Sequence, residues 1–138
     1  MTVIIDVAHA LQGLRNAVEL KGEDFIYDSE EFQKLRGPDC LYAVIEDGKA
    51  VPSCIVGHVL AAAGVPVKEM VWAFTPGDAG MFSSDVIWDL YLKINRDCEG
   101  VEITRDAASV LQAAQSCQDI GNTWGAALDA AELKAATL

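Results

Sequence analysis

The chain has 138 residues, 51% of them hydrophobic, and carries a formal net charge of −11 at pH 7. This length predicts a single compact domain spanning residues 1–138, with enough apolar residues for one core, and it argues against an intrinsically disordered chain. The 10 basic residues against 21 acidic ones argue against direct binding to nucleic acid, because affinity for phosphate comes from Lys and Arg.

The chain also lacks the sequence features of a membrane or secreted protein. No apolar run reaches the roughly 20 residues that a membrane span needs. The first residues, MTVIIDVAHALQ, lack the basic segment of a signal peptide and include Asp6 where its apolar stretch would run. The four cysteines form no CxxC pair, which favours reduced thiols. We therefore expect a cytoplasmic protein without a membrane partner.

The N-terminal part predicts a helix and then a strand. Apolar residues recur at spacings of three and four from about residue 3 to 21, and they form one helical stripe: Ile4, Val7, Leu11, Leu14 and Val18. Gly22 ends this helix. Residues at about 24–28 are aromatic and β-branched and predict a short strand. A short helix is expected from Asp28 to the Gly37-Pro38 pair.

A β-hairpin and a helix are predicted next. Asp47-Gly48 lies between apolar alternating runs and suits a type I′ turn, so the hairpin spans about 40–52. Ser53 then begins a helix that runs to Ala63 and stops before Gly64.

The second half of the chain is predicted to be mainly helical. Residues 67–75 fit either a helical turn or a strand, and residues 75–80 form a turn. Helices are expected at 84–94, 104–121 and 124–135. The fold class is therefore α+β: a mostly helical single domain with a small antiparallel sheet, made of the hairpin and the short strand.

Cys40, Cys54 and His58 are the residues that come nearest to a chemical site. Pairing across the hairpin brings Cys40 close to Cys54, and His58 lies one helical turn beyond Cys54. The spacing C-x13-C-x3-H matches no common zinc pattern, so we expect neither a metal nor a cofactor. Cys54 in the first turn of a helix is also a candidate nucleophile with His58 as its base, but no orienting carboxylate is identifiable. Core packing is the preferred interpretation of the cluster, and no enzymatic activity is predicted.

Four other residues are candidates for a surface that faces a partner. Trp88 lies between the inward and outward stripes of the helix at 84–94, and Tyr91 lies one position short of a full turn away. The pair forms either core or interface. Gln115 and Asp119 belong to a polar strip on the helix at 104–121. This strip suits a solvated face, a cap for the next helix or a partner.

The segments FIYD, CLYAVIEDGKAVPSCIVGHVLAAAGV and LQAAQSCQDIGNTWGAALDAAE resemble a group of small uncharacterised proteins encoded by actinobacterial phages, such as mycobacteriophages. The resemblance covers roughly residues 23–136, with a gap in the middle. It implies a phage origin and the cytosol of a bacterial host, and it transfers no functional residues.

The expected function is that of a phage accessory protein that acts by protein–protein interaction, with a host or phage protein as its partner. A homo-oligomer also stays open. Two alternatives are a Cys54-dependent hydrolase or transferase, and an acidic mimic of nucleic acid that binds a basic host protein.

Overall fold

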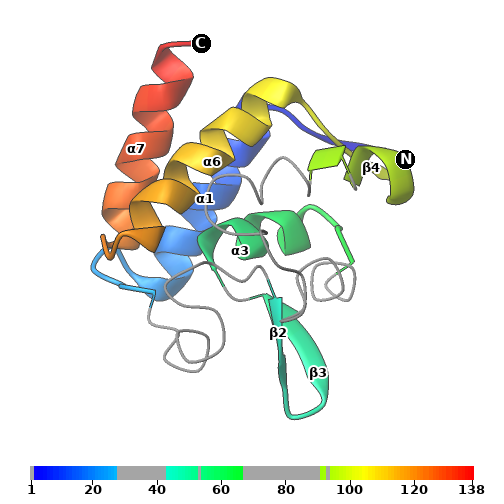
Figure 1. Cartoon of the computed structure of the whole chain (residues 1–138), viewed down its shortest axis with the longest axis horizontal. Coiled ribbons are helices and arrows are strands. Elements are labelled where there is room, and N and C mark those ends of the chain that lie inside the picture. Colours follow the sequence, from blue (N-terminus) through cyan, green and yellow to red (C-terminus); the bar gives the residue numbers. More distant parts are fainter. Residues whose placement is uncertain (1, 28–42, 53, 67–90, 93) are drawn as a thin grey trace.

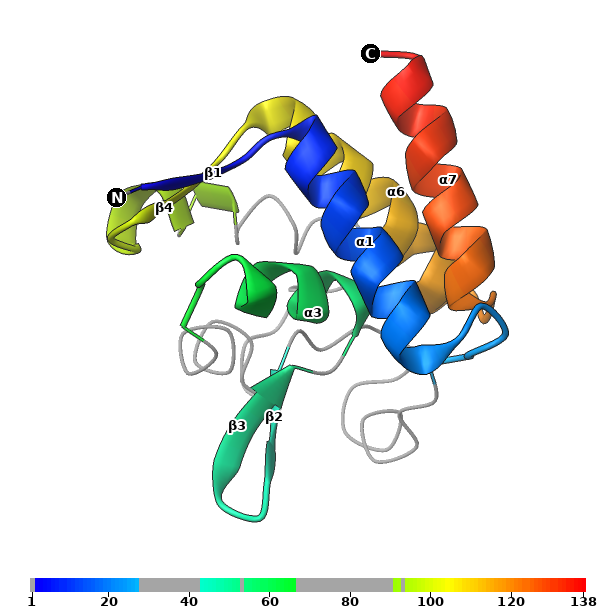
Figure 2. The same ribbon diagram turned by 180° about the vertical axis from the view of Figure 1, so that it is seen from behind.

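The computed structural model describes residues 2–27, 43–52, 54–66, 91–92 and 94–138. Within these ranges three long helices lie side by side: α1 (Val7–Lys21), α6 (Arg105–Asp119) and α7 (Trp124–Ala136). A shorter helix, α3 (Ile55–Ala62), packs against α1 and α6 (Figure 1). Seen from behind, α1 and α7 lie next to each other, with α3 below them (Figure 2).

The long helices begin at residues whose side chains cap them. Asp6 accepts a hydrogen bond from the main-chain N–H of His9 at 2.8 Å, and Thr104 and Thr123 do the same for Ala107 and Ala126 at 3.1 Å. A capping oxygen satisfies one of the N–H groups that a helix leaves unpaired at its start. Because Asp6 is such a cap, α1 starts at Val7, and the prediction of a helix from about residue 3 is wrong at its first turn.

The residues before Asp6 form a strand. β1 (Val3–Ile5) pairs in parallel with β4 (Val101–Ile103), so that Val3 lies opposite Val101. The side chain of Asn95 covers the other edge of β4: its Nδ2 donates to the carbonyl oxygen of Ile103 at 3.0 Å, and its Oδ1 accepts from the N–H of Ile103 at 2.8 Å.

The predicted fold class is wrong in its sheet. The described strands form two separate two-stranded sheets, of which β1–β4 is parallel and was not predicted. In the other, β2 (Ala43–Glu46) and β3 (Lys49–Pro52) pair antiparallel around Asp47-Gly48. The strand predicted at about 24–28 does not join them, because within its described part only an isolated bridge forms, between Ile26 and Thr123.

The core lies between α3 and the three long helices. Its largest fully buried side chains come from all of these elements, from β1 and from the helical turn that precedes β4: Ile5, Leu14, Ile55, Leu60, Ile94, Leu111, Gln115 and Trp124. No helix in the described part of the chain has the length and apolar character to cross a lipid bilayer. The predicted short helix from Asp28, the turn at 75–80 and most of the helix at 84–94 lie outside the described residues.

Candidate functional site: an acidic pocket beside a buried tryptophan

Trp124 is the first residue of α7, and its side chain is 0% exposed. Two other rings meet it edge-on: the ring of Phe25, with the centroids 4.6 Å apart, and the imidazole of His58, at 5.3 Å. Edge-to-face contacts of this kind add to the stability that burial of an aromatic ring already brings. Trp124 therefore joins α7 to α3 and to the segment that follows α1.

The amide of Gln118 completes this contact between helices. Its Oε1 accepts hydrogen bonds from the indole Nε1 of Trp124 at 3.0 Å and from the main-chain N–H of Ile55 at 2.9 Å. Cys54, the N-cap of α3, makes no capping bond with its side chain. Gln118 of α6 thus caps α3 from outside, and one buried oxygen links α3, α6 and α7.

The first N–H groups of α7 are all paired within the protein. Trp124 N donates to the carbonyl oxygen of Phe25 at 2.8 Å, and Gly125 N donates to that of Glu23 at 2.9 Å. The third, Ala126 N, donates to the hydroxyl of Thr123. Only glycine fits at position 125, because a Cβ there would lie 2.9 Å from the main-chain oxygen of Glu23. The start of this helix therefore offers no free N–H groups to an anion.

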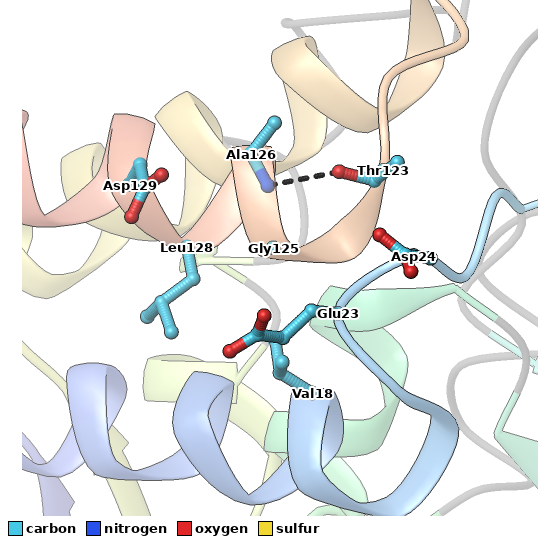
Figure 3. Close-up of a pocket in the computed structure, with 8 residues that line it drawn as sticks. All are labelled: Val18, Glu23, Asp24, Thr123, Gly125, Ala126, Leu128 and Asp129. Atoms are coloured by element: carbon cyan, nitrogen blue, oxygen red, sulfur yellow. Dashed lines mark hydrogen bonds between the residues drawn. The ribbon is translucent and has the colours of Figure 1, made fainter.

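An open pocket of about 340 Å³ lies where the 23–24 turn meets the start of α7. We call it the acidic pocket, and its lining residues are Val18, Glu23, Asp24, Thr123, Gly125, Ala126, Leu128 and Asp129. Figure 3 shows Glu23 and Leu128 pointing into the space between α1 and α7. Among the residues that the structure describes, the lining includes three carboxylates and no lysine or arginine. With the helix N–H groups already paired, the charge in this pocket suits a cation and disfavours an anion.

His58 contacts Trp124, the residue that begins the helix lining the pocket. Its Nδ1 is 3.0 Å from the carbonyl oxygen of Cys54, within its own helix. Burial lowers the pKa of His58 below 6.5, the contact with the Cys54 carbonyl opposes that change, and the positive charge of Lys21 adds to the lowering. The neutral imidazole is thus the form that fits this environment at neutral pH.

The structure brings Cys54 and His58 together but does not present a free thiol. Cys54 is fully buried and disulfide-bonded, so the expectation of a reduced thiol is wrong at this position. A sulfur in a disulfide is not a thiolate, which removes the nucleophile from the predicted Cys54–His58 pair. Cys98 and Cys117 form no disulfide, and Cys40 lies outside the described residues. Among the described residues, no group of three or more His, Cys, Asp or Glu side chains is arranged to hold a metal ion.

Of the residues predicted to face a partner, the three that the structure describes are buried or half-buried. Gln115 is 1% exposed, so its side chain belongs to the core and the surface interpretation is wrong for it. Tyr91 is half-buried and packs against the core, and Asp119 is half-buried beside Gln118. Trp88 lies outside the described residues.

Neither the acidic pocket nor Gln118 was predicted from the sequence. Glu23 and Asp24 lie at the start of a predicted strand, whereas Asp129 lies in a predicted helix about a hundred residues later. Comparison of the chain with protein-family models, curated proteins and solved structures gives no match.

Proposed function

We propose that this protein acts by binding a protein partner, and that the acidic pocket receives a lysine or arginine side chain of that partner. The observation that carries the proposal is the lining of the pocket, where Glu23, Asp24 and Asp129 stand beside a helix start whose N–H groups are already paired. The resemblance to small phage proteins suggests a host or phage protein as the partner.

The pocket suits a long basic side chain better than a small cation. Val18 and Leu128 give it apolar walls, and the carboxylates lie around them. Lysine and arginine bury their aliphatic stems along apolar surface while the charged group stays near water, which is the environment that this lining offers. The net charge of −11 favours the approach of a basic partner over long range.

The experiment compares two doubly substituted chains with the same net charge. Glu23→Lys with Asp24→Lys reverses the charge of the pocket wall, whereas Glu99→Lys with Glu102→Lys makes the same change near β4, on the far side of the molecule (Figure 1). The probe is a fluorescent oligo-arginine peptide at neutral pH and low salt, and its binding is followed by anisotropy.

We expect the pocket variant to bind the peptide roughly 5- to 30-fold more weakly than the wild type, since each exposed ion pair contributes up to about 1 kcal/mol. The β4 variant should lose much less affinity. Equal losses in the two variants would show that the peptide responds to net charge alone and would overturn the assignment of the pocket. Circular dichroism confirms that both variants keep their helices.

A further inference from the structure

We infer that protonation of His58 releases Trp124 from α3 and thereby loosens the 23–27 segment that forms one wall of the acidic pocket. The first part of this inference concerns the fold alone. The second part, the effect on the pocket, rests on the proposed function.

The geometry places one imidazole at the contact between two helices. His58 lies in the first turn of α3, its ring meets the indole of Trp124 at 5.3 Å with an angle of 71° between the planes, and its Nδ1 lies 3.0 Å from the Cys54 carbonyl oxygen. The indole also contacts the ring of Phe25 and donates a hydrogen bond to Gln118. A change in the ring of His58 therefore acts directly on Trp124.

The surroundings of His58 disfavour a positive charge. The start of α3 is the positive end of the helix dipole, and Lys21 at the end of α1 adds a second positive charge. The contact from α7 is the neutral indole of Trp124. In α6, the carboxylate of Asp119 accepts a hydrogen bond from Nε2 of Gln118, whose Oε1 bonds to the indole. The 23–27 segment contains two acidic residues, Glu23 and Asp24, and both line the pocket. Neither of them shifts the pKa of His58.

The lowered pKa of His58 makes the stability of the folded state depend on pH. The pKa of His58 is lower in the folded protein than its ordinary value of 6.5, with burial as the largest cause. At a pH well above 6.5 the ring is neutral in both the folded and the unfolded chain. As the pH falls below that value the unfolded chain takes up the proton first, so the folded state loses stability until its own His58 is protonated. Protonation thus favours any conformation in which His58 reaches water.

Trp124 connects this event to the pocket. The main-chain N–H of Trp124 donates to Phe25 O, and that of Gly125 donates to Glu23 O. These two hydrogen bonds hold the 23–27 segment against the start of α7. Displacement of Trp124 strains both bonds and shifts the wall that carries Glu23 and Asp24.

The experiment follows the indole N–H of Trp124 by nuclear magnetic resonance in the full chain, titrated from about pH 8 to about pH 5, the range in which histidine changes charge. The signal is assigned with Trp124→Phe. The chain has two histidines, so His9→Gln is the matched control for His58→Gln. We expect a transition with its midpoint below pH 6.5 in the wild type and in His9→Gln, and none in His58→Gln.

A transition that persists in His58→Gln, or a wild-type indole signal that does not change, would overturn the inference. The ring protons of His58 in the wild type give a second measurement that needs no substitution, and they must share the midpoint of the indole signal.

Binding of the oligo-arginine peptide above and below this midpoint tests the effect on the pocket. A steeper loss of affinity in the wild type than in His58→Gln supports it, and equal losses refute it. If the peptide binds at no pH while the indole transition occurs, the proposed function fails and the conformational switch stands.

Discussion

The Oε1 of Gln118 lies 3.0 Å from the indole nitrogen of Trp124, and both side chains are at most 1% exposed. The same oxygen accepts the main-chain N–H of Ile55, so two buried donors from two helices depend on a single acceptor. A buried donor left without an acceptor destabilises the folded state. This relationship makes Gln118 the side chain on which the contact between α3, α6 and α7 depends.

Gln118→Met should therefore destabilise the protein. Methionine has a similar length and no branch, so it fills most of the space but offers no oxygen to either donor. Each buried donor left unpaired costs about 1–3 kcal/mol, and we expect a loss of roughly 2–4 kcal/mol in the free energy of unfolding. Urea denaturation followed by circular dichroism measures it.

Gln12→Met is the control for this change. Gln12 makes a side-chain hydrogen bond too, to Asn16 at 2.9 Å, but on the exposed face of α1. Its replacement should cost less than about 0.5 kcal/mol, as is usual for surface positions. Similar losses at the two positions would mean that the buried oxygen of Gln118 is not what stabilises the helix contact.

The sequence predicts the start of α7 but does not predict that Gln118 is buried. Thr123 and the stripe that includes Trp124 are local signals, and they predicted the helix nearly to its observed ends. Gln118 lies in a polar strip that is typical of a solvated face. It is buried because the N-terminus of α3, about sixty residues earlier, covers it. Helical periodicity tells which residues share a face, but not which distant element covers that face.

The parallel pairing of β1 with β4 was not predicted from the sequence, for a related reason. Val3 and Ile5 fit a helical pattern and a strand pattern equally well, because three residues are too few to set a period. Their partners, Val101 and Ile103, lie about a hundred residues later in the chain. Asp6 distinguishes the helix from the strand, because the residues before an N-cap residue do not belong to the helix.

Gly13→Ala should also destabilise the protein, against the usual preference of helices for alanine. A Cβ at position 13 would lie 2.8 Å from Cγ1 of Val59, where α1 packs against α3. Overpacking of this kind costs about 1–3 kcal/mol, and alanine recovers about 0.5–1 kcal/mol through its helix propensity. A net loss of roughly 1 kcal/mol is therefore expected from urea denaturation.

A double-mutant cycle identifies the cause of this loss. Val59→Ala removes the methyl groups that the new Cβ would meet, so Gly13→Ala in that background should be neutral or stabilising. If Gly13→Ala costs the same in both backgrounds, the approach of α1 to Val59 is not the reason for the glycine.

Asn95→Asp should weaken the parallel sheet in a manner that depends on pH. The amide of Asn95 both donates to and accepts from Ile103, as the next strand of a sheet would. A carboxylate keeps the acceptor but sets a negative oxygen against the Ile103 carbonyl, at a cost of about 1–3 kcal/mol at neutral pH. Because the folded state disfavours this carboxylate, the introduced group binds a proton more readily folded than unfolded, and the protonated acid can donate to the carbonyl again. The cost should thus shrink as the pH falls.

Asn122→Asp makes the same charge change at an exposed position and is the control. Hydrogen exchange of the Ile103 amide together with urea denaturation at neutral and acidic pH measures both effects, and a cost that stays constant relative to Asn122→Asp would contradict the role of the Asn95 donor.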